Sequence, residues 1–230
     1  MVIGVIPARL ESTRFPRKIL FPIRNKPMIM HVYERALKSQ KLDRVIIAVD
    51  SQETVDALQK YNAEVLMTSP KHQSGTDRIA EAVSGIDADI IINIQGDEPM
   101  LDPEMIDGLV SLFDDKSVEM ATLASTIITE DDILNHNSVK VAIDKNHNAI
   151  GFFRTITDFS KKYFHHIGIY GYRKDVLNKF TKLEQSMNEK ALHLEQLRAL
   201  DNGIAIRVVV CDFPYRGVDV KKDLEQLNFE

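Results

Sequence analysis

The amino-acid sequence predicts an α/β fold with a Rossmann-like, mostly parallel sheet, and two features of the first half of the chain support this. Short apolar runs rich in Ile and Val recur at residues 2–6, 44–49 and 89–94, as expected for strands that are covered on both faces. Segments in which apolar residues repeat with helical spacing separate these runs. Because strands and helices alternate in this way, we expect parallel strands joined by right-handed crossovers.

The helices expected between these strands have recognisable first residues. The helix over 27–39 begins with Pro27, which suits the first helical position. Ser51 and Ser74 are predicted to cap helices that end near residues 60 and 83, with a short strand over 63–67 between them. The apolar residues of the first helix follow helical spacing and are Ile29, Val32, Tyr33 and Ala36.

The second half of the chain is less regular. Gly203 follows a predicted helix where a left-handed cap is expected. The polar segment 131–162 predicts a smaller lobe, placed at about 131–172, within a single domain that spans residues 1–230. The strands expected here cover 118–127, 138–143, 149–153, 164–172 and 204–210, and the helices cover 102–113, 175–180, 189–200 and 221–227.

Composition excludes several classes of protein. A chain of 230 residues with 44% hydrophobic residues can bury one large core, and its net charge of −5 argues against a general nucleic-acid binder. The single cysteine, Cys211, lies in an apolar run and is expected to be a buried small residue. No apolar stretch approaches the roughly 20 residues that span a membrane, and the N-terminus lacks the features of a secretory signal. We therefore expect a cytoplasmic protein without membrane contact.

The loop after the first strand is rich in positive charge. Four of its ten residues from 9 to 18 are basic: Arg9, Arg14, Arg17 and Lys18. Since ligands of open α/β sheets bind at the carboxyl ends of the strands, the loop is placed to bind a nucleoside triphosphate. It contains no glycine, so side chains rather than backbone must neutralise much of the phosphate charge. The alternative is a set of solvated surface cations.

The motif at residues 93–99 is the sharpest candidate for a metal site. Asp97 and Glu98 follow the strand that ends near residue 94, between Gly96 and Pro99. Mg²⁺ is commonly held by one or two carboxylates together with substrate phosphates, and Asp97 is the preferred ligand here. A polar turn without a ligand remains the alternative.

A second acidic position, Asp219, follows the last strand in the segment 215–219. Two acidic loops beyond strand ends could converge on one cation. Asp219 could equally be the N-cap of the final helix, and the sequence does not decide between these two roles.

Three further positions could bind an anionic substrate. The segment 74–78, Ser-Gly-Thr-Asp-Arg, combines hydroxyls, backbone amides and a guanidinium at a predicted helix start, which suits a base, a ribose or an anion. It could also be a capped helix start without a ligand. Arg154 and His166 end or lie in predicted strands, and each could either be structural or bind an acidic substrate.

Taken together, these segments resemble the 3-deoxy-manno-octulosonate cytidylyltransferases, or CMP-Kdo synthetases. The matching motifs occur in the family's order from end to end, and the set is specific although no single motif is. They include residues 6–9, 12–16, 26–36, 74–78, 95–99, 120–123, 139–141, 166–170, 194–198 and 217–219.

The resemblance implies a fold of the nucleotide-diphospho-sugar transferase type and the transfer of CMP from CTP to a 2-keto-3-deoxy sugar acid, with release of pyrophosphate. It further implies a homodimer formed through the second-half lobe and a place in lipopolysaccharide or capsule biosynthesis. Carried over by matching position, the nucleotide would be held by Ala8, Arg9, Lys18, Ser74, Gly75 and Arg78. Asp97 and Asp219 would bind Mg²⁺ and, with Arg9 and Lys18, form the catalytic set. The sugar acid would be contacted by Gln95, Arg154, His166, Glu195 and Gln196.

Several positions depart from the family pattern. Arg17 stands where the family usually has glycine, Ile19 where it has proline, Leu192 where it has glutamate and Val220 where it has threonine. The segment 151–158 keeps Arg154 but lacks the family's serine and both prolines. Because most changes fall around the sugar pocket, two alternatives stay open: a cytidylyltransferase for a different keto-acid sugar, and a nucleotide-binding paralogue without turnover.

Overall fold

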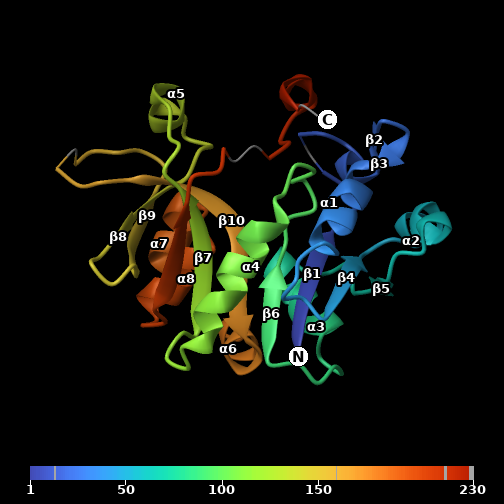
Figure 1. Cartoon of the computed structure of the whole chain (residues 1–230), viewed down its shortest axis with the longest axis horizontal. Coiled ribbons are helices and arrows are strands. Elements are labelled where there is room, and N and C mark those ends of the chain that lie inside the picture. Colours follow the sequence, from blue (N-terminus) through green and yellow to red (C-terminus); the bar gives the residue numbers. More distant parts are fainter. Residues whose placement is uncertain (13, 159, 215–216, 228–230) are drawn as a thin grey trace. The chain divides into compact units, whose positions relative to one another are not determined.

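The computed structural model describes residues 1–12, 14–158, 160–214 and 217–227. They divide into two compact units, the first made of Met1–Asp107 and Arg216–Glu230 and the second of Gly108–Tyr215. Figure 1 shows the elements of both units in the order of the chain. The predicted site residues are divided between the two units.

The first unit contains a parallel sheet with the strand order β6-β1-β4-β5. Ile6 of β1 is opposite Ile47 of β4, and Ile3 of β1 is opposite Ile91 of β6. The chain runs from β1 through β4 to β5 on one side of β1 and then returns to its other side to form β6. The strands are β1 (Val2–Ala8), β4 (Arg44–Val49), β5 (Val65–Met67) and β6 (Ile90–Asn93), which confirms the predicted fold class.

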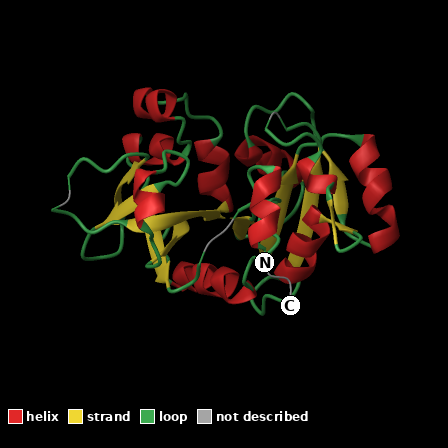
Figure 2. Ribbon diagram, turned by 90° about the horizontal axis from the view of Figure 1, so that it is seen from above, coloured by secondary structure: helices red, strands yellow, loops and turns green. Residues whose placement is uncertain are grey.

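Helices pack on both faces of this sheet (Figure 2). A side chain at Gly96 would come near both Ile6 of β1 and Ile29 of α1, whereas one at Gly75 of α3 would come within 3.2 Å of Pro7. Since neighbouring residues of a strand point to opposite faces, α1 and α3 cover different faces of β1. The helices are α1 (Met28–Ala36), α2 (Gln52–Leu58) and α3 (Gly75–Ala82), with a 3₁₀ turn, η2 (Gln59–Tyr61), after α2.

The predicted serine caps of α2 and α3 are confirmed, whereas Pro27 is the N-cap of α1 and not its first helical residue. The Ser51 hydroxyl accepts a hydrogen bond from the backbone N–H of Glu53, and the Ser74 hydroxyl accepts one from that of Asp77. Each serine thereby satisfies one of the backbone donors that a helix leaves unpaired at its start.

A small apolar cluster connects the loop after β1 to the C-terminal segment. Phe15, Ile23, Met28 and Val218 are buried together, and Phe21, Leu224 and Leu227 pack against them. Two residues that flank the cluster in sequence, Arg14 and Asp219, are placed by it. The short elements here are η1 (Lys18–Leu20), β2 (Pro22–Ile23), β3 (Lys26–Pro27) and η4 (Lys221–Gln226).

The second unit contains a mixed sheet. β7 pairs in parallel with β11 and antiparallel with β10, whose register shifts between Ile167 and Tyr170. β10 also pairs with β8, and β8 with β9, both antiparallel. The strands are β7 (Met120–Ser125), β8 (Lys140–Ile143), β9 (Ala149–Phe153), β10 (Phe164–Arg173) and β11 (Ile206–Cys211).

The sequence predicts one continuous helix over 189–200, and this prediction is wrong. It is divided by His193, whose φ of 52° lies in the left-handed region. Gly203 has a φ of 75°, which confirms the predicted left-handed cap after the second helix. The helical elements that lie in this unit or extend into it are α4 (Pro103–Ser111), η3 (Leu112–Asp114), α5 (Glu130–Leu134), α6 (Lys174–Phe180), α7 (Met187–Leu192) and α8 (Gln196–Asp201).

The predicted lobe over about 131–172 falls in the second unit, apart from Phe159, which lies outside the described residues. Its boundary and its role in a dimer stay predictions. Cys211 is partly buried, and its thiol donates to the carbonyl of Ala124. Within the described ranges, no helix combines the length and apolarity needed to cross a membrane.

Candidate functional site

The reversal of strand order at β1 places a crevice at the carboxyl ends of β1 and β6. In open α/β sheets, such a reversal is where ligands bind. A cavity of about 360 Å³ lies there within the first unit. It is lined from the loop after β1 (Arg9, Ser12, Arg14, Lys18), from the chain before and at the start of α3 (His72, Gln73, Ser74, Gly75), from the loop after β6 (Gln95, Gly96, Asp97) and by Asp219.

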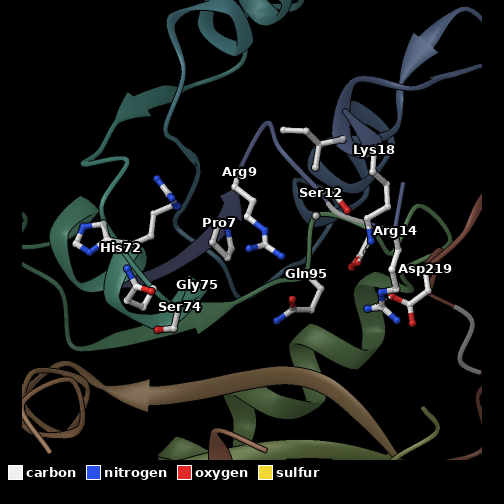
Figure 3. Close-up of a pocket in the computed structure, with 15 residues that line it drawn as sticks. Pro7, Arg9, Ser12, Arg14, Lys18, His72, Ser74, Gly75, Gln95 and Asp219 are labelled. Carbon is white, nitrogen blue, oxygen red and sulfur yellow. Dashed lines mark hydrogen bonds and ion pairs between the residues drawn. The ribbon is translucent and has the colours of Figure 1, made fainter. Parts of the chain in front are cut away.

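The cavity has two chemically different ends, which Figure 3 shows. His72, Ser74 and Gly75 lie at one end, and Lys18 and Asp219 lie at the other. Arg9 and Gln95 lie between them in this view. At the α3 end the charge of Arg78 is paired with Asp50. This end, which has little net charge, and the group of charged side chains at the other suit an elongated ligand with a neutral part and an anionic part.

Three of the four cations predicted in the first loop line the cavity. Arg9 is exposed and, among the residues that the structure describes, makes no hydrogen bond or ion pair, so its guanidinium can accept an anionic partner. Arg17 instead pairs with Glu53 and has a φ of 58°. That value favours glycine, which is the residue that the family resemblance places here, so Arg17 adopts a backbone conformation that a glycine would adopt more easily. Thr13 lies outside the described residues.

Lys18 joins the two acidic segments. Its ammonium lies 2.5 Å from the carboxylate of Asp97 and donates to the carbonyl of Val218 at 2.8 Å. The backbone N–H of Val218 in turn donates to the carbonyl of Asp97 at 2.9 Å. These contacts hold residues 18, 97 and 218 together although they are far apart in the sequence.

Asp219 also lines the cavity, and its carboxylate pairs with Arg14 at 2.9 Å. The 3₁₀ turn η4 has Val220, not Asp219, at its N-cap position. The backbone N–H groups of Asp219 and Val220 both donate to the carboxylate of Asp223. The alternative role of Asp219 as a helix cap is therefore wrong, and its side chain is left to the cavity. Tyr215 and Arg216 of the same motif lie outside the described residues.

The two carboxylates suit a magnesium ion in their chemistry. In the described part of the chain, no group of three or more His, Cys, Asp or Glu residues could hold a metal. Asp97 and Asp219 line one cavity, however, together with cations that favour phosphate. Because Mg²⁺ often takes only one or two carboxylates and completes its shell with phosphate and water, this donor set fits.

The start of α3 forms the end of the cavity that has little net charge. The Ser74 side chain caps the helix, and the close approach of Gly75 to Pro7 leaves little space for any larger residue. Ala8, at the end of β1, is 1% exposed, so it can offer a ligand only backbone atoms. Ser74 and Gly75 line the cavity, whereas Ala8 is not among its lining residues, and the predicted roles of all three in nucleotide binding stay predictions.

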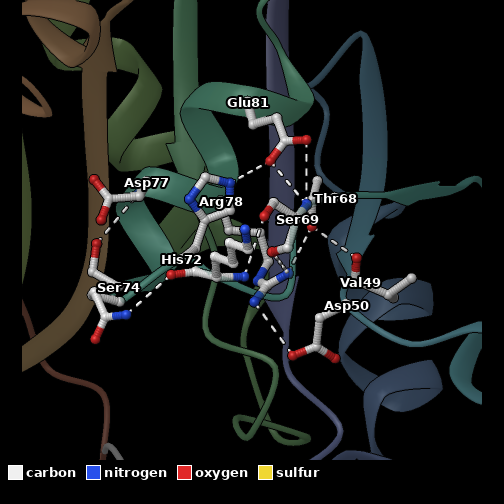
Figure 4. A network of polar contacts seen from close by, with 11 residues as sticks. Val49, Asp50, Thr68, Ser69, His72, Ser74, Asp77, Arg78 and Glu81 are labelled. Atoms are coloured by element: carbon white, nitrogen blue, oxygen red, sulfur yellow. Dashed lines mark hydrogen bonds and ion pairs between the residues drawn. The ribbon is translucent and has the colours of Figure 1, made fainter.

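Arg78 is held in an internal network that Figure 4 shows. Its guanidinium donates to the hydroxyl of Thr68 at 2.6 Å and pairs with Asp50 at 3.3 Å. The other carboxylate oxygen of Asp50 accepts from the backbone N–H of Leu10 at the start of the basic loop. Arg78 also lines the cavity but is 4% exposed, so its clearest contribution is to fix the chain after β1, β4 and β5.

His72 is a cavity residue that the sequence analysis missed. Its Nε2 atom contacts the carboxylate of Glu81, which also accepts from the backbone N–H of Ser69 (Figure 4). The hydrogen bond from the Ser69 backbone, followed by that of His72, holds the pKa of Glu81 below its ordinary value. The only sequence signal for His72 was its position two residues before Ser74, in a loop that carries no other motif.

The residues predicted to contact the sugar acid are divided between the units. Gln95 lines the cavity of the first unit, and its side chain lies 3.4 Å from that of Asn93. Arg154, His166, Glu195 and Gln196 belong to the second unit. Gln196 is buried, and Glu195 lies 4.0 Å from Arg198.

His166 is a buried, neutral histidine. Its Nε2 atom lies 3.0 Å from the hydroxyl of Thr122, which donates to the carbonyl of Ile169. Because the hydroxyl proton is used in that way, Nε2 carries the imidazole proton and Nδ1 remains an acceptor. Burial, followed by the neighbouring His165, lowers the pKa of His166 to about 3. His166 could therefore accept a hydrogen bond from a sugar hydroxyl but would not attract a carboxylate by charge.

We expect the ring signals of His166 in an NMR titration to stay constant between about pH 5 and pH 8, the range in which most histidines titrate. The unfolded chain would bind this proton near pH 6.5, whereas the folded protein binds it at about 3. Between these values the unfolded state holds more protons, so this group makes the protein less stable as the pH falls. A midpoint near 6.5 for His166 would contradict the buried assignment.

Comparison with known proteins gives a consistent result. A family model of cytidylyltransferases matches residues 3–206. The 3-deoxy-manno-octulosonate cytidylyltransferase of Thermodesulfovibrio yellowstonii is 45% identical and covers 98% of this chain and 96% of its own. The protein of the same name from Solibacter usitatus is 44% identical, with coverages of 99% and 93%.

A solved structure of CMP:2-keto-3-deoxy-manno-octonic acid synthetase complexed with CTP superimposes with a TM-score of 0.90. It is 39% identical, and the match covers 98% of this chain and 95% of that protein. This confirms the predicted fold of the nucleotide-diphospho-sugar transferase type and the predicted enzyme class, a nucleotidyltransferase. The chain belongs to the 3-deoxy-manno-octulosonate cytidylyltransferase family.

Proposed function

We propose that this protein transfers CMP from CTP to a 2-keto-3-deoxy sugar acid, with 3-deoxy-manno-octulosonate (Kdo) as the preferred acceptor, and releases pyrophosphate. The observation that carries this proposal is the cavity of the first unit, where Arg9, Arg14 and Lys18 lie with Asp97 and Asp219. The relatives carry the name of this activity, and the similar solved structure was determined with CTP.

The proposed orientation of CTP follows the two ends of the cavity. The cytidine part would lie at the end of little net charge beside Ser74 and Gly75, and the triphosphate would extend towards Arg9 and Lys18. The free guanidinium of Arg9 can bind phosphate oxygens without losing an internal partner. Lys18 is already held by Asp97 and the carbonyl of Val218, so little side-chain freedom is lost when phosphate binds.

The reaction is an in-line displacement at the α-phosphorus. The oxygen of the sugar's anomeric hydroxyl forms the new bond, the bond from the α-phosphorus to the bridging oxygen breaks, pyrophosphate leaves, and the hydroxyl proton passes to solvent. Such chemistry requires positioning and charge neutralisation rather than a covalent intermediate. Arg9 and Lys18 would offset the negative charge that develops on the leaving pyrophosphate.

Asp97 and Asp219 would hold Mg²⁺. When bound, the ion would supply positive charge to the phosphate oxygens and lower the pKa of the attacking hydroxyl. The pairing of each carboxylate with a cation, Asp97 with Lys18 and Asp219 with Arg14, keeps both ionised side chains in place without the ion. We expect that removal of divalent ions with EDTA abolishes turnover and that added Mg²⁺ restores it.

The acceptor contacts that we propose from the family resemblance are Gln95, Arg154, His166, Glu195 and Gln196. Arg154 supplies positive charge for the carboxylate of the acid, and the neutral His166 supplies a hydrogen-bond acceptor. A sugar with both a carboxylate and several hydroxyls suits this set of side chains. We propose a dimer and a cytoplasmic location on the strength of the family resemblance alone.

The test is a turnover assay with a panel of acceptors. Purified protein with Mg²⁺ is given CTP and either Kdo or another keto-acid sugar, and pyrophosphate release is followed. We expect release with CTP and Kdo and little release with ATP, GTP or UTP. Comparable or faster turnover with a different keto acid would instead support the alternative that arises from the altered segment 151–164. Binding of CTP in calorimetry without turnover on any acid would overturn the proposed function.

A further inference from the structure

Lys140 is a fully buried lysine in the second unit that the proposed reaction does not use. It lies at the start of β8 and is 0% exposed. Its ammonium donates to three backbone carbonyls, those of Asn135 at 2.8 Å, Ser138 at 2.7 Å and Arg154 at 3.0 Å. An ammonium carries three donors, so all of them have partners within the protein.

Burying a charged lysine at this position is unfavourable in free energy. Burial lowers the pKa of Lys140, and only the nearby Asp132 acts strongly in the other direction. A buried charge is stable only where its donors are satisfied. An apolar side chain would fill the same space, but the three carbonyls would lose the lysine donor, and of them that of Asn135 would keep the backbone N–H of Ser138. The three carbonyls come from the chain before β8 and from Arg154, directly after β9, so the lysine adds a side-chain link between two strands that already pair.

One of these carbonyls belongs to Arg154, whose side chain makes a second set of contacts. Its Nε donates to the carbonyl of Leu192 at 2.6 Å, its Nη2 to that of His193 at 3.0 Å and its Nη1 to that of His136 at 2.9 Å. Leu192 is the last residue of α7 and His193 is its C-cap. Arg154 therefore satisfies carbonyls that a helix leaves unpaired at its end.

This end of α7 determines where the following residues lie. His193 adopts a left-handed conformation, and after it the chain turns into α8, which begins at Gln196 with Glu195 at its N-cap position. Glu195 and Gln196 are two of the residues proposed to contact the sugar acid. A guanidinium has five N–H donors, and the three carbonyls use one each, so with respect to the described residues two donors of Arg154 remain for a carboxylate.

We propose that Lys140 is a positioning residue for the acceptor sugar. By binding the carbonyl of Arg154, its ammonium fixes the guanidinium that caps α7. Through this cap it also fixes the turn that carries Glu195 and Gln196. This inference rests on the proposed function only where it assigns these residues to the acid. Its structural part, from the ammonium to the turn at His193, concerns the second unit alone.

The test compares Lys140→Met with wild type and with Lys145→Met, a matched control at an exposed lysine on the β8–β9 turn. We expect Lys140→Met to raise the KM for Kdo by roughly ten- to a hundredfold, because small misplacements of binding groups have effects of this size. The KM for CTP should change less than about twofold, since the nucleotide cavity lies in the other unit. Lys145→Met should leave both values unchanged.

Hydrogen exchange followed by mass spectrometry gives a readout that does not depend on turnover. In the protein without ligands, Lys140→Met should speed exchange in peptides that cover residues 187–197 and leave those covering 74–83 as in wild type. Arg154→Gln should speed exchange in the same 187–197 peptides, and it provides this arm if Lys140→Met does not fold. A loss of thermal stability with both KM values and the exchange of 187–197 unchanged would show that Lys140 only stabilises the unit, and would overturn the proposal.

The two proposals fail in distinguishable ways. If wild type binds CTP but turns over no acid of the panel, the proposed function fails, and the exchange experiment still decides whether Lys140 controls the turn. If wild type is active on Kdo and Lys140→Met raises the two KM values equally, the function stands and the positioning role of Lys140 is wrong.

Discussion

Replacing Asp97 with asparagine is expected to lower kcat with CTP and Kdo by at least about a hundredfold, while the protein stays folded. Asparagine has the same shape but lacks the negative charge that Lys18 contacts at 2.5 Å and that the proposed Mg²⁺ site requires. The backbone carbonyl of residue 97, which accepts from Val218, is kept in the variant, so the C-terminal segment should remain in place. Initial rates of pyrophosphate release and a far-UV circular dichroism melt measure the two parts of this result.

Asp87→Asn is the matched control for this experiment. Asp87 is an exposed aspartate that precedes β6, whereas Asp97 follows it, so the same change of charge is made at the other end of the same strand. We expect wild-type rates for the control. Wild-type rates for Asp97→Asn, with Mg²⁺ as the only divalent ion, would remove Asp97 from the metal site. Asp219→Asn should reproduce the loss, because both carboxylates are assigned to one ion.

The position of the cavity in the first unit was predictable because it follows from the order of the strands. The apolar runs at 44–49 and 89–94 marked parallel strands, and loops beyond their carboxyl ends had to meet at one edge of the sheet. The second role considered for Asp219 could not be excluded in advance. Its exclusion depends on Asp223, which accepts from the backbone at the start of η4 where the sequence suggested Asp219 itself.

Other features depend on contacts between distant segments, which a linear pattern does not contain. The break between α7 and α8 has neither glycine nor proline, and its left-handed His193 is held by Arg154, 39 residues earlier. Arg78 was expected to face a ligand, but its partners Asp50 and Thr68 follow two other strands. In both cases an arginine suited to bind an anion is also the donor that organises neighbouring backbone, and sequence alone does not separate these roles.

Replacing Glu189 with glutamine should have the largest effect on stability, a loss of about 3–5 kcal/mol in the free energy of unfolding. Glu189 and Arg198 are 4% and 6% exposed and form a two-pronged ion pair across the break between α7 and α8, at 2.6 and 2.8 Å. The guanidinium also lies over the ring of Phe180. Without the carboxylate of Glu189, Arg198 loses the counter-charge of its two short contacts and retains Glu195 at 4.0 Å, and removing one partner of a buried pair costs more than the pair itself contributes. Urea titrations followed by circular dichroism measure the loss, since the chain has no tryptophan.

The Glu189–Arg198 pair should make a contribution to stability that is lost in acid, and Glu189→Gln should lack this contribution. Burial opposes ionisation of Glu189, but the hydrogen bonds and charge of Arg198, with the backbone N–H of Ser186, hold the pKa of Glu189 below its ordinary value. The stabilisation is therefore complete above the pKa of an unfolded glutamate and is lost as the pH falls through the lower folded value. Wild type should lose stability over this range more steeply than Glu189→Gln, whereas Glu184→Gln, at an exposed position in the same segment, should follow wild type. Parallel curves for wild type and Glu189→Gln would mean that the carboxylate is not ionised against Arg198 in the folded protein.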